Sequence, residues 1–268
     1  MSSVEDHYTS SDLGDRILAA LETSGADMGA LTIDDLAPVD ALHIRGREAT
    51  VELAQMARLD AEQLVLDAGC GIGGTCRYLA ATFGCKVIGV DLTDEHCSVA
   101  EMLSARVGLS QLTEFHRGSV LELPFANDHF DLVWTEHTQM NIADKAAFYG
   151  ELFRVLKPGG GLAFHDIFAG PEGDLHFPVP WATDASISHL IPIEELRTVL
   201  GAAGFSQLAW EDKTGASTAF FEGMVGAAPQ AIGIHVIMRD AKTKIPNLLR
   251  NLKGGRVCVV QAVLKKPS

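Results

Sequence analysis

The chain has 268 residues, of which 47% are hydrophobic and 21% charged, a balance typical of globular proteins. This composition excludes collagen, coiled coil and intrinsic disorder. The formal charge of −14 opposes binding to a phosphate backbone, so we expect no nucleic-acid partner. No apolar run approaches the ~20 residues of a membrane span, and the acidic N-terminus lacks the apolar segment of a signal peptide. We therefore expect a cytoplasmic protein without membrane association, and leave a homodimer open.

Charge is distributed unevenly along the chain. Residues 1–62 hold 4 basic and 13 acidic groups, whereas residues 239–268 hold 8 basic groups and 1 acidic group. A basic stretch of this kind is able to contact an anion or a membrane surface, but it is more often a solvated face. We interpret it as lysines that flank one helix and one strand.

The cysteines, at positions 70, 76, 85, 97 and 258, are odd in number and irregularly spaced. This pattern does not indicate a disulfide framework. The sequence contains no Cys-x-x-Cys and no Cys/His spacing of the kind that binds zinc. We therefore predict mostly buried, reduced thiols and no metal.

Helices are predicted before the first strand. Residues 10–22 place Ile17 and Leu21 on one face of a helix that a serine begins. A short helix starts within residues 32–36, and a longer one spans residues 46–59. We group residues 1–60 as an N-terminal helical cap.

Strands and helices alternate along the remainder of the chain, residues 61–268. The predicted strands are residues 64–66, 85–90, 113–117, 130–135, 161–167, 205–210 and 256–264. Helices are predicted at residues 75–83 and 143–156, and the Pro and Gly residues at 158–160 end the second one. Such alternation predicts a parallel, doubly wound α/β sheet.

One Gly/Pro-rich segment, residues 168–192, is longer than an ordinary connection between two elements. It follows the fifth predicted strand and so lies near the carboxyl ends of the strands, where α/β proteins bind ligands. We predict that this segment is a lid.

The glycine-rich turn after the first predicted strand is the most informative stretch. Residues 65–74 read VLDAGCGIGG, and Asp91 closes the next strand 22 residues after Gly69. Glycines permit close approach of the backbone to a ligand, and the helix start that follows offers unpaired N–H groups. A carboxylate at position 91 suits the two hydroxyls of an adenosine ribose. The alternative is a tight turn that binds nothing.

This turn fits two cofactor templates. Gly69-x-Gly71-x-x-Gly74 matches the dinucleotide fingerprint of nicotinamide-dependent oxidoreductases. Gly69-x-Gly71-x-Gly73, preceded by Asp67, matches the loop that binds S-adenosylmethionine (SAM). The remainder of the sequence decides between them.

Four motifs resemble those of the class I SAM-dependent methyltransferases. They are VLDAGCGIGG (65–74), VIGVDL (87–92), LPFANDHFDLVW (123–134) and LFRVLKPGGGL (152–162). The resemblance implies a Rossmann-like sheet of seven strands whose last strand, residues 256–264, is antiparallel and inserted beside the fifth. The oxidoreductase hypothesis leaves the KPGGGL turn and this strand unexplained. A looser resemblance, through HFPVPWA at residues 176–182, is to the sarcosine/dimethylglycine N-methyltransferases and the ubiquinone- or tocopherol-type enzymes.

The resemblance also implies which residues bind SAM and its product, S-adenosyl-L-homocysteine. In the family, Asp67 and the glycine turn hold the methionine part, Asp91 holds the ribose and Leu92 packs on the adenine. Ser119 stands where the family usually has an aspartate for the adenine amino group. Arg45 is expected at the methionine carboxylate, with a surface arginine as the alternative. The implied ligands are Arg45, Asp67, Gly69, Cys70, Gly71, Gly73, Asp91, Leu92, Ser119, Val120, Thr135 and Glu136.

Methyl transfer from a sulfonium depends mainly on proximity and in-line alignment. A base is needed only when the acceptor carries a proton. His137, just past the fourth strand, is the candidate base because its ordinary pKa of about 6.5 suits proton transfer near neutral pH. The alternative is a structural hydrogen bond to a loop carbonyl. Glu136 is the second catalytic candidate, as a partner for a cationic acceptor or for the SAM ammonium.

Three residues are candidates for binding the acceptor. Trp181 in the predicted lid covers an acceptor or packs against the core. Gln139 is placed to orient polar acceptor atoms. Tyr8, with His7, closes over the site as a cap or lies in a frayed terminus.

The sequence therefore predicts a SAM-dependent methyltransferase of a small molecule. Trp181, Glu136 and the HFPVPWA segment slightly favour an amine acceptor of the sarcosine/dimethylglycine type. The alternative is O- or C-methylation of an aromatic, quinone-like or polyketide-like natural product. A third hypothesis is a SAM-binding protein without catalytic activity, since a fold alone does not specify chemistry.

Overall fold

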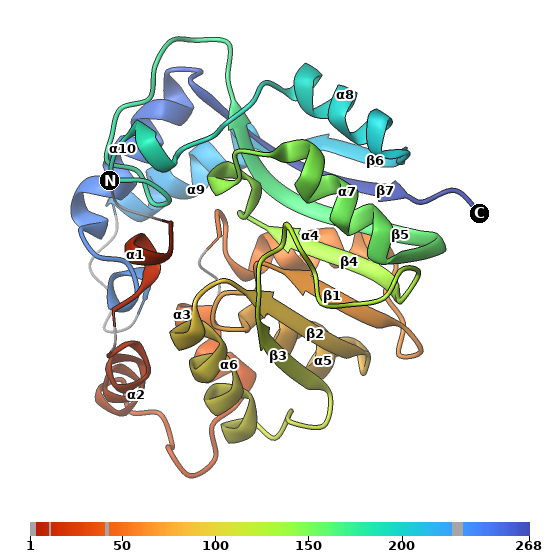
Figure 1. The fold of residues 1–268 in the computed structure, drawn as a ribbon. Coiled ribbons are helices and arrows are strands. Elements are labelled where there is room, and N and C mark those ends of the chain that lie inside the picture. The colour runs from red at the N-terminus through yellow and green to blue at the C-terminus, as the bar shows by residue number, and fades with distance from the viewer. Residues whose placement is uncertain (1–3, 11, 41–42, 227–232) are drawn as a thin grey trace.

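The structure, a computed structural model, describes residues 4–10, 12–40, 43–226 and 233–268. A central sheet is covered by helices on both faces, and further helices gather at one end of it (Figure 1). None of the helices in these ranges is long and apolar enough to cross a membrane. The cytoplasmic location stays a prediction.

Seven strands form one sheet in the order β3-β2-β1-β4-β5-β7-β6. Neighbouring strands from β1 to β5 pair in parallel, while β7 pairs antiparallel with both β5 and β6. The predicted doubly wound sheet, with the final strand inserted beside the fifth, is confirmed. The strands are β1 (Leu64–Ala68), β2 (Lys86–Asp91), β3 (Thr113–Arg117), β4 (Phe130–Glu136), β5 (Leu156–Ala169), β6 (Ser206–Asp212) and β7 (Val257–Lys265).

Strand β5 begins five residues earlier than the sequence predicts. The segment that ends helix α7 (Lys145–Val155) does stop the helix, but it continues directly into the sheet. Leu156 pairs with Phe130 of β4, and the Gly159 N–H donates to the carbonyl of Lys266 beyond β7. Pairing with neighbours on both sides therefore converts the predicted turn into strand.

Ten α-helices and three 3-10 helices lie within the described ranges. The α-helices are α1 (Val4–Tyr8), α2 (Leu13–Thr23), α3 (Ile33–Asp40), α4 (Arg47–Ala57), α5 (Gly74–Phe83), α6 (Asp94–Arg106), α7 (Lys145–Val155), α8 (Ile193–Ala203), α9 (Thr214–Gly226) and α10 (Ala241–Lys253). The 3-10 helices are η1 (Gln139–Asn141), η2 (Ala185–Ile187) and η3 (Ile234–Val236). Helix α1 contains His7 and Tyr8, which the sequence places before the first helix.

The two faces of the sheet have separate cores. Helices α7 and α8 cover one face through residues such as Phe148 and Leu196, and α4 and α5 cover the other through Leu53 and Leu79. Helix α4 falls within the predicted cap but packs on the sheet, so the helices that lie beyond the sheet are α1 to α3. The division of the chain at residue 60 stays a prediction.

Two further clusters lie at the end of the sheet where the parallel strands have their carboxyl ends (Figure 1). Helices α2 and α3 pack against α6 and against Ile72 of the glycine turn. Helices α9 and α10 pack around Trp181 of the connection after β5. All five cysteines are free thiols and four are buried, as predicted.

Candidate active site

A cavity of about 1050 Å³ opens at the carboxyl ends of the central strands. Its polar end is formed by the glycine turn and the segments that follow β2, β3 and β4. The predicted residues that line this end are Asp67, Gly69, Cys70, Gly71, Asp91, Leu92, Ser119, Val120, Glu136 and His137. Its apolar end is formed by α1, the connection after β5, α9 and α10, with Tyr8, Trp181, Phe220, Phe221, Ile245 and Leu248. The cavity thus brings together residues from both ends of the chain.

The glycine turn is held against the carboxyl end of β2. The N–H groups of Gly69 and Cys70 donate to the carbonyl of Val90 at 2.8 and 3.1 Å. Gly69 has a φ of 86°, and a Cβ at this position would collide with the hydroxyl of Thr138. Gly71 also has a positive φ, 51°, which leaves its N–H directed at Asp91. Glycine is required here for backbone conformation and close approach.

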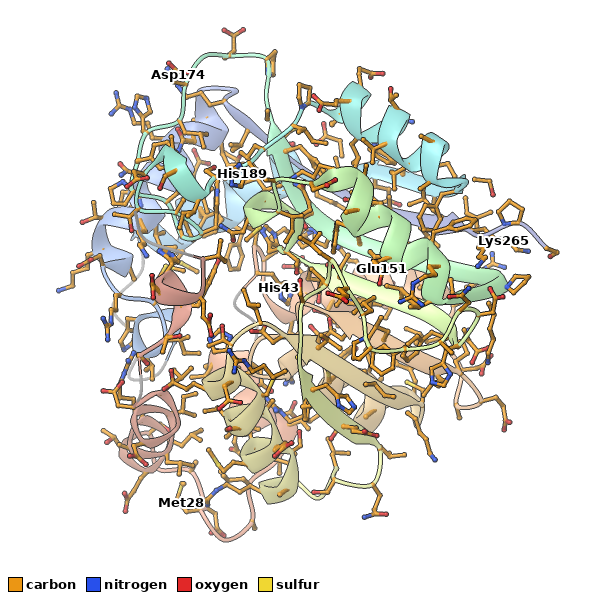
Figure 2. The ribbon with its side chains drawn as sticks, viewed as in Figure 1. Met28, His43, Glu151, Asp174, His189 and Lys265 are labelled. Carbon is orange, nitrogen blue, oxygen red and sulfur yellow. The ribbon has the colours of Figure 1, made fainter. Side chains whose placement is uncertain are left out.

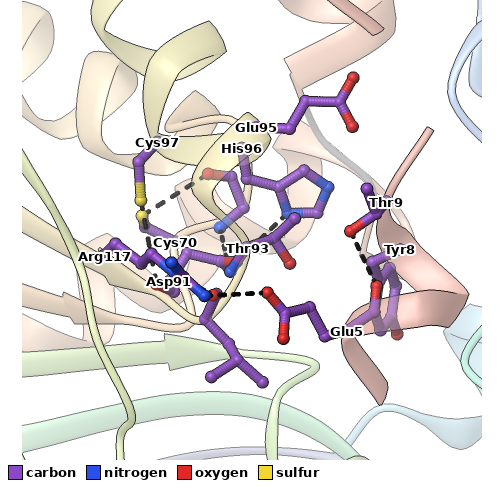
Figure 3. A network of polar contacts seen from close by, with 12 residues as sticks. Glu5, Tyr8, Thr9, Cys70, Asp91, Thr93, Glu95, His96, Cys97 and Arg117 are labelled. Atoms are coloured by element: carbon purple, nitrogen blue, oxygen red, sulfur yellow. Dashed lines mark hydrogen bonds and ion pairs between the residues drawn. The ribbon is translucent and has the colours of Figure 1, made fainter. Parts of the chain in front are cut away.

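Asp91 is oriented by three hydrogen bonds. Its carboxylate accepts the N–H groups of Gly71 and Thr93, each at 2.9 Å, and lies 3.3 Å from Nδ1 of His96. Burial opposes ionisation of Asp91, but His96 and the two backbone donors hold its pKa below the ordinary value. Figure 3 shows Asp91 among Thr93, His96 and Cys70, with Glu5 of α1 reaching to Arg117. The result is a fixed anionic acceptor beside the glycine turn.

Asp67 is a buried carboxyl at the end of β1. The thiol of Cys76 donates to it at 3.2 Å. Burial first, and then the neighbouring carboxylates of Glu136 and Asp91, raise the pKa of Asp67 to about 8. Asp67 is therefore largely protonated at neutral pH unless a cation approaches it.

Glu136 belongs to a network that joins β4 to α4 and α5. It accepts a hydrogen bond from Thr75 at 2.7 Å and from Thr50 at 3.2 Å. Nε2 of His43 lies 3.4 Å from the same carboxylate. Figure 2 shows His43 near the middle of the molecule, beside the carboxyl ends of the central strands. The sequence did not single out His43, because its partners lie on elements distant along the chain.

His137 lies where the sequence predicts, directly after β4 and in the cavity lining. Its backbone N–H donates to the carbonyl of His165, and the ring atom Nε2 is buried without a hydrogen-bond partner among the described residues. Burial, and then the neighbouring rings of His165 and His43, lower the pKa of His137 well below the ordinary value. The imidazole is consequently neutral at pH 7. Its role as a base stays a prediction.

Helix α1 is tied to the connection after β5 across the cavity. The hydroxyl of Tyr8 donates to Oδ1 of Asn141 at 3.0 Å, and the amide of Asn141 donates to the carbonyl of Trp181 at 2.9 Å. Nε2 of His7 lies 3.1 Å from the carbonyl of Pro180. This arrangement agrees with α1 as a cap over the site.

Trp181 both packs against the core and lines the cavity. Its side chain is only 2% exposed, and its indole N–H donates to Ser188 at 2.9 Å. Residues 171–174 of the same connection are exposed. The predicted lid therefore has an anchored part at Trp181 and an exposed part before it.

Arg45 has partners other than those predicted for it. Its guanidinium pairs with Glu48 at 2.7 Å and with Glu52 at 2.6 Å. These carboxylates, with Glu52 first, raise the pKa of Arg45. Although Arg45 lies along the cavity, two carboxylates of α4 already pair with its guanidinium, and contact with a methionine carboxylate stays a prediction.

Three other predicted residues lie outside the cavity lining. Gln139 is fully buried and its amide donates to the carbonyl of Ile167 at 2.5 Å. Thr135 is buried within β4, and Gly73 is the N-cap residue of α5. Ser119 does line the cavity, where its hydroxyl accepts the N–H of Leu121 at 3.2 Å. The structure thus gives Gln139 a structural hydrogen bond in place of an acceptor contact.

The strand order, the glycine turn and Asp91 together define the architecture of a class I methyltransferase. Residues 66–164 match the family model described as "Methyltransferase domain". This match agrees with the resemblance to the class I SAM-dependent methyltransferases that the sequence motifs indicate.

Curated relatives are similar to part of the chain. The chain is 43% identical over 96 residues to tocopherol O-methyltransferase of Arabidopsis thaliana, covering 36% of this chain and 28% of that protein. It is 31% identical over 164 residues to methyltransferase GfsG of Streptomyces halstedii, covering 61% of this chain and 57% of that protein. The chain therefore spans less than two thirds of the length of these relatives.

A solved structure extends the likeness of fold to the whole chain. Phosphoethanolamine N-methyltransferase 2 of Haemonchus contortus, in complex with S-adenosyl-L-methionine, superposes with a TM-score of 0.74 at 18% identity. The alignment covers 100% of this chain and 61% of that one. The helices outside residues 66–164 thus belong to the same architecture.

Proposed function

We propose that the protein is a SAM-dependent methyltransferase that acts on a small molecule. Asp91 carries this proposal, because it is held by two backbone donors beside the glycine turn and faces the cavity. A carboxylate in this position suits the two hydroxyls of a ribose. The methyltransferase domain at residues 66–164 supports SAM over a nicotinamide cofactor. After transfer of the methyl group, S-adenosyl-L-homocysteine would be the product.

Titration calorimetry tests the cofactor, and a screen with labelled SAM tests the reaction. We expect SAM and S-adenosyl-L-homocysteine to bind and NAD⁺ and NADH not to bind. Binding of NADH without SAM would refute the proposal in favour of an oxidoreductase. Tight SAM binding without transfer to any acceptor in a broad screen would favour a SAM-binding protein that is not an enzyme.

Binding of SAM is expected to release about one proton near pH 7, because the ammonium of its methionine part favours ionised Asp67. The pKa of Asp67 is about 8 in the free protein, so a bound cation lowers it and drives the proton off. SAM affinity should therefore rise with pH, by up to about tenfold per unit between about pH 5 and pH 7. Calorimetry in two buffers of different ionisation enthalpy measures the proton count. Asp67→Asn, which cannot ionise, is the control, and a wild-type count near zero would contradict the assignment.

The lining of the apolar end of the cavity indicates the chemical class of the methyl acceptor. It is lined by aromatic and aliphatic side chains, among them Trp181, Phe221 and Leu248. The carboxylates in the described lining, Asp40, Asp67, Asp91 and Glu136, belong to α3 and the strand ends. Glu136, the carboxylate expected to meet a cationic amine, accepts hydrogen bonds from Thr50 and Thr75 at the polar end of the cavity.

We therefore favour O- or C-methylation of an apolar acceptor over the amine acceptor of the sarcosine/dimethylglycine type. A panel of phenols, quinols and glycine derivatives, each at equal concentration with labelled SAM, separates the two. We expect turnover of an apolar acceptor and none of sarcosine or dimethylglycine. Faster methylation of either amine would restore the N-methyltransferase hypothesis.

The variant His137→Ala is expected to lower turnover by about 10²-fold or more, with an acceptor that must lose a proton. SAM affinity should change little. Because burial lowers the pKa of His137, the wild-type rate at saturating SAM should stay level from pH 7 towards pH 6 and fall only in more acidic solution. The exposed His129→Ala is the control. A His137→Ala rate within about twofold of wild type would show a structural histidine.

A further inference from the structure

Lys244 lies on the buried face of α10. Its relative exposure is 7%, and the same helix face carries the buried residues Ile245, Leu248 and Leu252. Lys244 lines the apolar end of the cavity. The interpretation of residues 239–268 as a solvated basic face is therefore wrong for this lysine.

The ammonium of Lys244 has no hydrogen-bond or ion-pair partner among the described residues. Asp240, at the start of α10, attracts it only at longer range. On the facing helix α1, His7 is close enough for the lysine charge to lower its pKa, after the larger effect of burial. Among the described residues nothing neutralises this cation, which lies in the largely apolar part of the cavity wall.

A second buried lysine, Lys145, has a structural role and serves as a comparison for Lys244. Lys145 is 5% exposed, and its ammonium donates to the backbone carbonyls of Gln139, Ile142 and His189 at 2.5 to 2.7 Å. Those three bonds satisfy all of its donors. Lys244 has no such set within the part of the chain that the structure describes, so those residues alone do not account for its burial.

We propose that Lys244 binds an anionic group of the methyl acceptor, a carboxylate or a phosphate, while the apolar part of the acceptor contacts Trp181 and Phe221. This inference rests on the proposed methyltransferase function and specifies the substrate class. Charge-assisted hydrogen bonds to an anion would satisfy the three donors of the ammonium. Helices α1 and α10 lie at the same end of the sheet (Figure 1), so the anion would lie at that end, near His7 of α1.

Three eight-carbon probes test the site on protein loaded with S-adenosyl-L-homocysteine. Titration calorimetry compares octanoate, octyl phosphate and the uncharged octanamide, each below its micelle concentration. We expect at least one of the two anions to bind about tenfold or more tightly than octanamide. The preferred anion distinguishes a carboxylate from a phosphate.

Variants test whether Lys244 causes the preference for an anionic probe. Lys244→Met should bind all three probes within about threefold of one another, and Lys244→Arg should keep the preference for an anion. Lys242→Met, which removes an exposed lysine from the same helix, should behave as wild type. No preference in wild type, no binding of any probe, or a preference that survives in Lys244→Met would overturn the inference. If the wild-type protein did not bind S-adenosyl-L-homocysteine, that result would instead count against the proposed function.

Discussion

The variant Asp91→Ala is expected to weaken SAM binding by about 2–4 kcal/mol, which is roughly 30- to 1000-fold in affinity. The substitution removes the carboxylate that we assign to the ribose hydroxyls. It also frees the N–H groups of Gly71 and Thr93, which Asp91 holds at 2.9 Å in the structure. The glycine turn would thus lose a restraint together with its ligand contact.

Titration calorimetry with SAM and S-adenosyl-L-homocysteine measures this loss. Asp94→Ala is the matched control, because Asp94 is an exposed carboxylate three residues further along the chain. We expect that control to stay within about twofold of wild type, since exposed charges contribute little. An unchanged affinity in Asp91→Ala would show that Asp91 does not bind the ribose.

The variant Arg77→Ala is expected to lower the free energy of unfolding by about 3–5 kcal/mol. Arg77 is fully buried on α5 and pairs with Asp40 of α3 at 2.5 Å. It also donates to the carbonyl of Ile72 in the glycine turn at 2.7 Å and to that of Ala100 in α6 at 3.2 Å. Its removal leaves a buried carboxylate without its cation and opens a cavity where three helices meet the turn.

Urea unfolding followed by circular dichroism measures the change in stability. Arg106→Ala removes an exposed arginine from the end of α6 and should cost no more than about 1 kcal/mol. Addition of Asp40→Asn to Arg77→Ala should recover part of the loss, because the second change removes the unpaired charge. A cost below about 1 kcal/mol for Arg77→Ala alone would show that the buried pair is not a structural link.

Much of the site follows from local sequence pattern. The glycine turn and Asp91 lie at the ends of consecutive strands, and parallel strands bring those ends to one edge of a sheet. The positions of Asp67, Glu136 and His137 follow in the same way, since each closes or follows a strand. Buried strands are short and apolar, so their limits were predicted within a few residues, except where β5 gains partners on both sides.

The partners of each charged side chain were decided only by tertiary structure. Arg77 and Asp40 are 37 residues apart, and six helices and strands separate His43 from the strand that carries its partner Glu136. The ion pairs of Arg45 with Glu48 and Glu52 are local, but Arg45 precedes α4 and has a positive φ, so the spacing rule for pairs on a helix does not predict them. Separation along the chain hides the other contacts, because they depend on how helices pack against a finished sheet.

Lys244 shows most clearly which features follow from the sequence and which depend on tertiary structure. The basic composition of residues 239–268 is a property of the sequence, and it raises the question of an anion. Composition does not specify which lysine faces solvent and which faces the cavity. That depends on the rotation of α10, which Ile245, Leu248 and Leu252 set by packing against the cluster around Trp181. The apolar residues of α10 thus determine which lysine is buried in the cavity wall.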